Sequence, residues 1–261
     1  MHRPAGMHVT DHHAHVGGPL VVLVHGSLAR GTTFTRVVRR LDDLHVLTYD
    51  RRGYGRSRQM PLGVLSDHVA DLLSLLGDGP AVVVGHSYGG DVALGAALAA
   101  PGCVVAVGAY EPPLSWLEWW PRRARSASDE DPDRFAEGFF RRMVGDGAWE
   151  RATERTRAEL EADGPALRAE LTSLRAGGRP FDVTSTAVPA VFGRGSASRW
   201  HHRRAVDELV AAVPGAQLVE IAGAAHGAHL THPAAFGDFV RAVVRAAAAG
   251  RIPWPAQNPK G

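Results

Sequence analysis

Gly85-His86-Ser87-Tyr88-Gly89 is the stretch of this sequence that decides the fold. It has the form G-x-S-x-G, and it lies between the β-branched run 81–84 and the small-residue run 89–100. The first run predicts a buried strand and the second a helix. A serine at such a tight strand-to-helix turn is crowded, and flanking glycines relieve the crowding. The turn therefore predicts that Ser87 stands at the carboxyl edge of a sheet, where a helix dipole favours negative charge.

On both sides of this turn, short apolar runs alternate with longer amphipathic stretches. This alternation is typical of a parallel α/β sheet. The runs predict strands at residues 20–24, 45–49, 81–84, 104–109, 188–192 and 217–221. The amphipathic stretches predict helices at residues 34–41, 66–76, 89–100 and 233–249. The fold class is therefore α/β, with a mostly parallel central sheet flanked by helices.

The alternation stops between the strand at 104–109 and the strand at 188–192. That interval contains three tryptophans close together, and charged helical segments follow them without any strand pattern. We therefore expect one α/β core formed by residues 1–112 and 180–261. A helical cap or lid is expected as an insertion at residues 113–179.

The composition excludes several other classes of protein. The 261 residues are 45% hydrophobic and 21% charged, which is typical of a globular chain rather than a disordered one. The net charge is +2 without a clustered basic excess, so a nucleic-acid partner is not expected. No long apolar segment and no signal peptide are apparent, and the single cysteine, Cys103, cannot form an internal disulfide. These features predict a cytoplasmic protein without membrane contact, and they leave its oligomeric state open.

Four stretches, in this order along the chain, resemble the α/β-hydrolase fold superfamily. They are His25-Gly26-Ser27, residues 50–57, the turn at 85–90 and Gly223-Ala224-Ala225-His226. The resemblance covers roughly residues 18–112 and 183–247, and it is to the serine hydrolase type with a G-x-S-x-G nucleophile elbow. It implies that the helical insertion matches the cap domain of that superfamily.

A serine hydroxyl becomes an effective nucleophile only when a base takes its proton. The resemblance implies a histidine on the loop after the last strand, which selects His226, with His229 and His232 as nearby rivals. These three histidines also have an H-x-x-H-x-x-H spacing, which could suggest a metal site. No carboxylate or cysteine accompanies them, so neither a metal nor a cofactor is expected.

The third catalytic residue departs from the commonest pattern of the superfamily. The acid usually follows the penultimate strand, but residues 193–198 contain none, and Asp207 lies too far along. A known variant places the acid after the strand that follows the elbow helix, which selects Glu111. The order Ser87, Glu111, His226 satisfies the rule for this fold. A dyad without an acid, an acid from the cap, or a Glu111 that only anchors the cap are the alternatives.

The resemblance also implies an oxyanion hole and a substrate pocket. Backbone N–H groups of Ser27 and Tyr88 are the expected donors, and the Ser27 hydroxyl or Leu28 could share that role. The expected substrate-binding residues are Leu28, Trp116 and Trp119, with neighbouring Trp120 at the same apolar pocket rim. Packing within the cap is the alternative for the tryptophans.

Together these residues predict a cofactor-independent serine hydrolase. It would cleave a carboxylic ester, lactone or thioester of a small molecule through an acyl-enzyme on Ser87. A C–C bond hydrolase or an acyl transferase would use the same groups. A small-molecule-binding protein without catalysis is a further alternative, and the substrate itself is beyond the reach of the sequence.

Overall fold

The sheet places the carboxyl ends of its six parallel strands along one edge. The computed structural model describes residues 3–121, 132–176 and 178–250, so the ends of the expected core range and residues 122–131 and 177 of the expected cap range lie outside the described residues. In the described chain, seven strands pair in the order β1-β3-β2-β4-β5-β6-β7. They are β1 (His8–His12), β2 (Leu20–Val24), β3 (His45–Asp50), β4 (Ala81–His86), β5 (Val104–Tyr110), β6 (Ala190–Gly195) and β7 (Gln217–Ile221).

Six of these strands are parallel, and β1 alone pairs antiparallel, with β3. The expected, mostly parallel sheet is thereby confirmed. The sequence did not predict β1, because its residues HVTDH are polar and only partly buried at the edge of the sheet. A polar edge strand carries little of the apolar pattern that identifies the inner strands.

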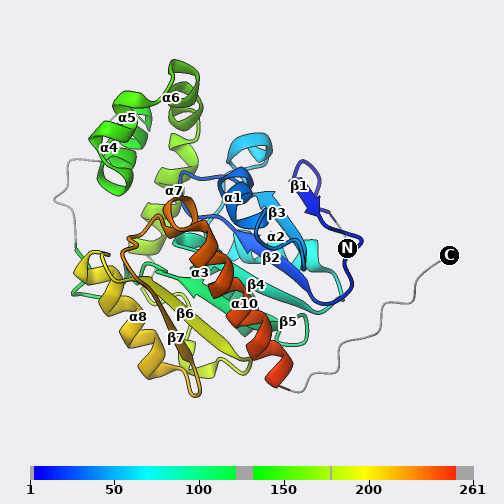
Figure 1. Ribbon diagram of the computed structural model, residues 1–261. Coiled ribbons are helices and arrows are strands. Elements are labelled where there is room, and N and C mark those ends of the chain that lie inside the picture. Colours follow the sequence, from blue (N-terminus) through cyan, green and yellow to red (C-terminus); the bar gives the residue numbers. More distant parts are fainter. Residues whose placement is uncertain (1–2, 122–131, 177, 251–261) are drawn as a thin grey trace.

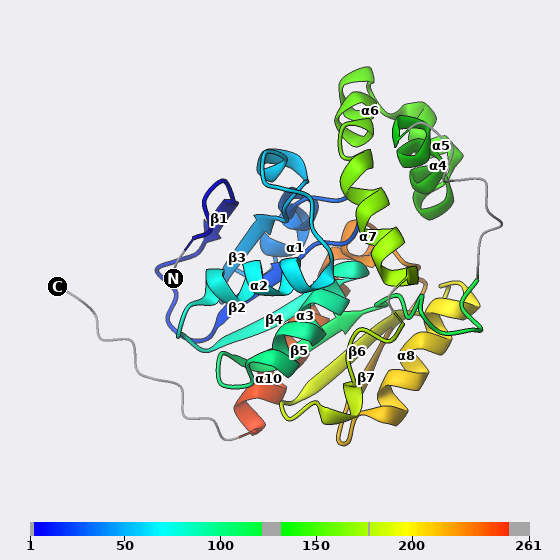
Figure 2. The same cartoon turned by 180° about the vertical axis from the view of Figure 1, so that it is seen from behind.

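The helices form a layer on each face of the sheet and a separate group above its carboxyl edge (Figure 1). They are α1 (Thr35–Val38), α2 (Leu65–Leu76), α3 (Tyr88–Ala99), α4 (Pro132–Val144), α5 (Asp146–Arg151), α6 (Glu154–Glu161), α7 (Gly164–Ala176), α8 (Trp200–Ala212), α9 (Ala228–Thr231) and α10 (Pro233–Ala249). Figure 2 shows α2, α3 and α8 in front of the sheet, with α10 behind it.

The alternation of side chains along β2 explains the two layers. Val21 and Leu23 pack into the cluster formed with α1 and α10, whereas Val22 and Val24 pack into the cluster formed with α2, α3 and α8. All four side chains are fully buried. Burying an aliphatic side chain of this size contributes about 1.5–3 kcal/mol, so a continuous apolar run suits an inner strand covered on both faces.

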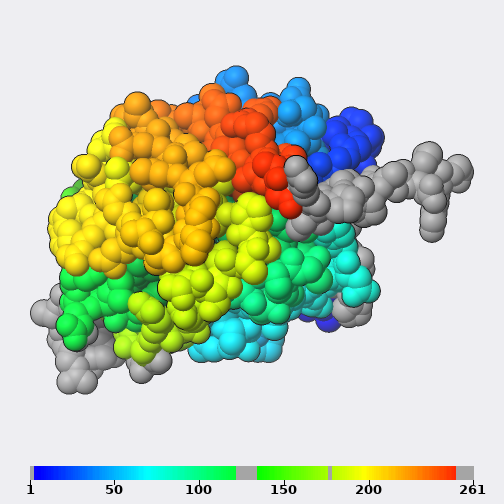
Figure 3. All heavy atoms as spheres, turned by 90° about the horizontal axis from the view of Figure 1, so that it is seen from below, coloured from blue at the N-terminus to red at the C-terminus, as the bar shows by residue number. Residues whose placement is uncertain are grey.

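Helices α4 to α7 lie between β5 and β6 in the chain, within the range expected for the cap. A third cluster, formed by Leu28, Phe135, Ala136 and Leu167, packs part of this helical group against the loop after β2. On the side turned away from the cap, residues of α8, β7 and α10 make up one continuous part of the surface (Figure 3). No helix among the described residues is both long and apolar enough to span a membrane.

The turn between β4 and α3 is the most crowded part of the backbone. Ser87 has φ 54° and ψ −130°, in the left-handed region. A Cβ atom at Gly85 would lie 2.0 Å from the carbonyl oxygen of Gly89, and one at Gly89 would lie 2.2 Å from the carbonyl oxygen of Val24. Only glycine fits at both positions, which is the physical basis of the G-x-S-x-G pattern.

Replacing Gly89 by alanine tests this crowding. Residue 89 is helical, so alanine would ordinarily stabilise the helix, but its Cβ would overlap the backbone of β2. We expect Gly89→Ala to lower the free energy of unfolding by about 3 kcal/mol or more, measured by urea denaturation. Gly102→Ala is the control, because a Cβ there meets no atom within 4 Å. Equal stabilities of the two variants would contradict this account.

Candidate active site

Ser87 follows β4 directly and occupies the N-cap position of α3, where its side chain makes no capping hydrogen bond. Its backbone N–H donates to the carbonyl oxygen of Tyr110 at 2.9 Å, which ties the turn to the end of the neighbouring strand β5. The loop after β2 packs closely on the other side, because a Cβ at Gly26 would lie 2.9 Å from the Cβ of Ser87. The elbow is therefore held between the ends of the two strands that flank β4.

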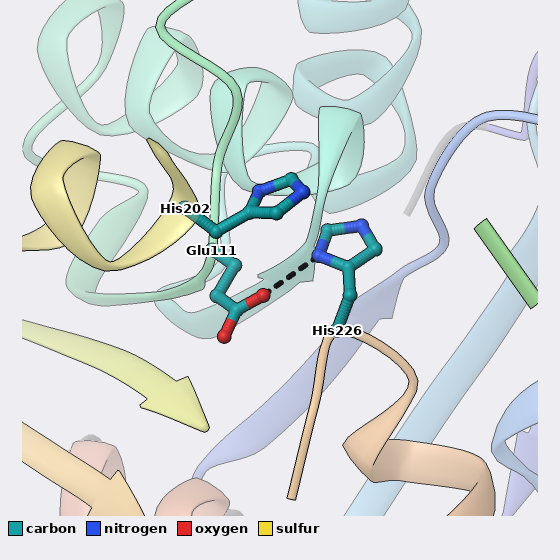
Figure 4. A group of neighbouring side chains, drawn as sticks. All are labelled: Glu111, His202 and His226. Atoms are coloured by element: carbon teal, nitrogen blue, oxygen red, sulfur yellow. Dashed lines mark hydrogen bonds and ion pairs between the residues drawn. The ribbon is translucent and has the colours of Figure 1, made fainter. Parts of the chain in front are cut away.

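Glu111 follows β5 directly and has φ 48°, also in the left-handed region. Its side chain is fully buried. One carboxylate oxygen, Oε1, accepts the backbone N–H of Gly195 at 2.8 Å and the hydroxyl of Ser198. The other, Oε2, lies 2.8 Å from Nδ1 of His226, as the dashed line in Figure 4 shows. Burial raises the pKa of Glu111, while His202 and the hydrogen bonds from Ser198 and Gly195 oppose that rise.

His226 lies on the loop after β7, which brings it beside Glu111. Since the carboxylate can only accept, Nδ1 carries the proton and Nε2 keeps its lone pair. The ring of His86 also supports this loop, because its Nε2 lies 2.7 Å from the carbonyl oxygen of His226. Burial lowers the pKa of His226 to about 3, and His229, His201 and Arg199 add to the effect. The imidazole is thus neutral at pH 7 and able to take up a proton.

His202 is a site residue that the sequence did not reveal. It comes from α8, and its ring stacks on that of His226 with centroids 4.2 Å apart and 23° between the planes (Figure 4). Only 4% of its surface is exposed. His202 and His226 are more than twenty residues apart, so no local sequence pattern connects them. Their contact arises from the packing of α8 against the loop after β7.

Glu111, His202 and His226 also place ligand-type atoms within 4.8 Å of one another. This group is not the H-x-x-H-x-x-H set, because His229 packs against His86, at 4.2 Å between ring centroids. The ring nitrogens of two stacked imidazoles present their lone pairs within roughly parallel planes, so they do not converge on one ion. The hydrogen bond between Glu111 Oε2 and His226 Nδ1 also engages two of the atoms that a metal would need as ligands. The geometry therefore favours a proton-transfer pair over a metal site.

The loop after β2 places Ser27 next to the elbow, but its hydroxyl has another partner. It donates to Oε2 of Glu170, on helix α7, at 2.7 Å. The hydroxyl is therefore engaged by the cap, which leaves the backbone N–H groups of Ser27 and Tyr88 as the candidate oxyanion donors. Leu28 is buried against cap residues and has φ 54°.

Glu170 is the second site residue that the sequence did not reveal. Its buried carboxylate also accepts from the Arg51 guanidinium, from the Tyr54 hydroxyl at 2.8 Å and from His68 at 3.1 Å. Burial alone would raise the pKa of Glu170, but the charge of Arg51 and the hydrogen bonds hold it well below the ordinary value. A carboxylate of the cap thus lies ionised beneath the loop that carries Ser27.

A pocket of about 340 Å³ opens beside Ser87. It is lined by Ser27, Ser87, Tyr88, Pro113, Ser115, Trp120, Pro121, Phe139, Arg142, Met143, Leu171, Leu174, Arg175, Arg199, His201 and His202. Its walls are therefore built from the core, the cap and α8 together.

The three expected substrate-binding residues, Leu28, Trp116 and Trp119, are not among those lining residues. Trp116 packs against Phe181, with ring centroids 5.7 Å apart, and Trp119 lies under the Arg204 guanidinium at 4.3 Å. Leu28 is used for packing the cap onto the core. The tryptophan that reaches the pocket is Trp120. The spacing of the three tryptophans could not predict this, because the segment they occupy forms no regular helix.

Comparison with known proteins gives relatives that include an esterase, a lipase and part of a polyketide synthase. A pimeloyl-[acyl-carrier protein] methyl ester esterase of Chromobacterium violaceum is 31% identical over 259 residues, which cover 87% of this chain and 93% of that enzyme. The lipase LipV of Mycobacterium tuberculosis is 33% identical over 158 residues, or 59% of this chain and 57% of the lipase. The polyketide synthase ThaQ of Burkholderia thailandensis is 34% identical over 260 residues, but the match covers only 12% of the synthase.

Among solved structures, the enol-lactonase of Burkholderia xenovorans LB400 has the same fold. The TM-score is 0.73 at 22% identity, with 92% of this chain and 96% of the lactonase covered. Residues 21–239 also match the model of the alpha/beta hydrolase family. That match spans most of the chain, and the mostly parallel sheet of this chain agrees with the match. This chain therefore belongs to the alpha/beta hydrolase family.

Proposed function

We propose that this protein is a cofactor-independent serine hydrolase that cleaves an ester, lactone or thioester of a small molecule. The observation that carries the proposal is the Glu111–His226 hydrogen bond of 2.8 Å at the same edge of the sheet as Ser87. Ser87 and Glu111 follow adjacent strands, and the residue before Ser87 contacts the backbone of His226. The three residues that we propose as a catalytic triad follow three different strands of the sheet.

In the proposed reaction, the Ser87 hydroxyl attacks the carbonyl carbon of the bound ester. His226 takes the hydroxyl proton at Nε2, the nitrogen that Glu111 leaves free. Glu111 holds the imidazole in the required tautomer and stabilises the imidazolium that forms. The C–O or C–S bond then breaks, and His226 returns the proton to the leaving group. Water, activated by the same histidine, releases the acid from the acyl-enzyme.

The negative charge on the tetrahedral intermediate requires donors that are already in place. The amino end of α3 supplies the Tyr88 N–H, and the loop beside Gly26 supplies that of Ser27. The contact between Ser27 and Glu170 orients this loop without using its backbone N–H. Losing one such donor typically costs about 2.7–4 kcal/mol of transition-state stabilisation.

The relatives support ester chemistry over the alternatives with the same fold. The relative matched along nearly its whole length is named for a methyl ester, and a second relative is named a lipase. C–C bond cleavage and acyl transfer would use the same nucleophile. They differ in the group that leaves or in the acceptor that replaces water, and a screen of acyl esters and lactones of graded length separates these reactions.

Labelling of Ser87 tests whether the protein is an enzyme or only binds a small molecule. We expect a fluorophosphonate probe to label the wild-type protein, since an activated serine attacks phosphorus, and Ser87→Ala to remove the label. The same change should lower kcat for p-nitrophenyl butyrate by about 10⁶-fold. Ser185→Ala, at an exposed serine, is the control. Folded wild-type protein that is neither labelled nor active would contradict the proposal.

Replacing Glu111 by glutamine tests the acid. The amide cannot stabilise the imidazolium, so kcat should fall by about 10⁴-fold with little change in KM. Asp207→Asn is the matched control, because Asp207 is the first acid after β6 and pairs with Arg194 at an exposed position. If Glu111→Gln kept its activity while Asp207→Asn lost it, the assignment of the acid would be wrong.

The pH profile tests the environment of His226. The imidazole acts as a base only when neutral, so kcat/KM is full above its pKa and falls as the pH drops through it. Because burial lowers this pKa, we expect the acid limb below the ordinary histidine value of about 6.5. Hydrolysis of p-nitrophenyl acetate, with circular dichroism at each pH to confirm folding, provides the measurement. An acid limb at or above that value would contradict the expected effect of burial.

A further inference from the structure

The loop after β2 carries a proposed oxyanion donor, and Arg51 of the core fixes the two residues that precede this donor. The guanidinium of Arg51 donates to the carbonyl oxygens of His25 and Gly26, at 2.8 and 3.0 Å. The backbone N–H of Arg51 donates to Nε2 of His25 at 2.9 Å, so the other ring nitrogen of His25 donates to the carbonyl oxygen of Gly26 at 2.8 Å. These bonds reach the residue directly before Ser27.

The cap holds Ser27 itself. Helix α7 runs from the other cap helices down to the core (Figure 2), and Oε2 of its Glu170 accepts the Ser27 hydroxyl at 2.7 Å. Ser27 lines the pocket beside Ser87, so this contact lies at the wall of the site. Anchoring the Ser27 side chain also restricts its backbone, because only one rotatable bond, χ1, separates the hydroxyl oxygen from the main chain.

The carboxylate of Glu170 is held so that it cannot turn away from Ser27. Its Oε1 is bound by Arg51 and lies 3.1 Å from Nε2 of His68. Its Oε2 accepts the Tyr54 hydroxyl at 2.8 Å as well as that of Ser27. All of these partners belong to the core, and Glu170 itself is buried. A cap helix thus supplies a rigid, charged acceptor to the loop that carries the donor.

An ion pair with Arg51 would by itself explain a buried carboxylate at this position, but it does not explain the contact with Ser27. The guanidinium is bound by Oε1, whereas the two hydroxyls are bound by Oε2. Ser27 is only partly buried and borders the pocket, where water or a bound substrate could satisfy its hydroxyl instead. The contact therefore joins the cap to the wall of the site, in addition to the ion pair.

We propose that Glu170 is a positioning residue for the oxyanion hole, and that it acts through the Ser27 hydroxyl on the backbone N–H of Ser27. This inference rests on the proposed function. The oxyanion hole is then complete only while α7 is packed on the core, so docking of the cap and assembly of the hole are one event. Donors that are already in place stabilise the transition state because they need no rearrangement as the charge develops. A misplacement of about 1 Å can lower a rate by about 10²-fold.

Two hydroxyl deletions at the same carboxylate oxygen test the proposal. Ser27→Ala removes the donor on the loop and keeps the backbone N–H, whereas Tyr54→Phe removes the other donor to Oε2. We expect Ser27→Ala to lower kcat for p-nitrophenyl butyrate about tenfold, less than the loss of a whole donor, with KM nearly unchanged. Tyr54→Phe should keep the wild-type kcat, although it removes the more deeply buried of the two hydrogen bonds.

The pH profile of Ser27→Ala separates positioning of the oxyanion hole from a general loosening of the site. The change leaves the contact between Glu111 and His226 intact, so the acid limb of kcat/KM should fall at the same pH as in the wild-type protein. A shifted limb would show that the histidine had been disturbed as well, which contradicts an effect confined to the loop after β2.

A double-variant cycle shows whether the Ser27 hydroxyl acts through Glu170 or directly on the oxyanion. Glu170→Asp keeps a negative charge opposite Arg51 but draws the carboxylate back by one methylene group, so it should lower kcat as Ser27→Ala does. Added to Glu170→Asp, the Ser27→Ala change should then have little further effect on kcat. Glu154→Asp, the same shortening at an exposed position on α6, is the control and should keep the wild-type kcat.

Three outcomes would overturn the proposal: a wild-type kcat in Ser27→Ala or Glu170→Asp, an equal loss in Tyr54→Phe, or a full further loss when Ser27→Ala is added to Glu170→Asp. The proposed function fails on other results, namely wild-type protein without esterase activity or without label at Ser87. Circular dichroism confirms that each variant is folded. The Ser27 and Tyr54 variants leave every charge in place, so they test the proposal even if Glu170→Asp does not fold.

Discussion

Strained backbone at the carboxyl edge of the sheet is the constraint on which the site depends. Leu28, Ser87 and Glu111 have φ values of 54°, 54° and 48°, and they lie just after β2, β4 and β5. Each such residue costs on the order of 1–3 kcal/mol. The surrounding sheet offsets this cost, because the backbone N–H groups of Ser87 and Glu111 each donate to the end of a neighbouring strand. Three adjacent parallel strands are thus each followed by a residue with positive φ at the same edge of the sheet.

A buried ion pair joins the cap to this edge. Arg51 follows β3 and contacts Glu170 of α7, and both side chains are almost completely inaccessible to water. Removing one partner of such a pair typically costs about 3–5 kcal/mol, because it leaves an uncompensated charge. Since Glu170 also accepts the Ser27 hydroxyl, a movement of α7 would release the loop that carries the proposed oxyanion donor. Helix α7 therefore contacts the loop that carries the proposed oxyanion donor and also contributes residues to the pocket wall.

Local sequence patterns predicted the parts of this arrangement that arise from neighbouring residues. Apolar runs identified the six parallel strands, and the elbow turn identified Ser87, because both depend on backbone constraints within a few residues. Glu170 and His202 lie on amphipathic helices, where polar and charged residues are ordinary. Their roles arise from how the cap and α8 pack against the core, and a single sequence does not encode that packing in any short pattern. The same reason explains why Trp120, rather than Trp116 or Trp119, reaches the pocket.

The proposed acid, Glu111, lies one strand away from the position that is commonest in the superfamily. Strand β6, which carries the acid in the commonest pattern, pairs directly with β5. The loop after β6 has no carboxylate, but Gly195, the last residue of β6, donates its N–H to the carboxylate of Glu111, and Ser198 of that loop donates its hydroxyl. The acceptor and its donors thus come from two adjacent strands and meet at the same edge of the sheet. Because adjacent parallel strands lie about 5 Å apart, a left-handed turn at residue 111 is enough to bring the Glu111 carboxylate to the end of β6.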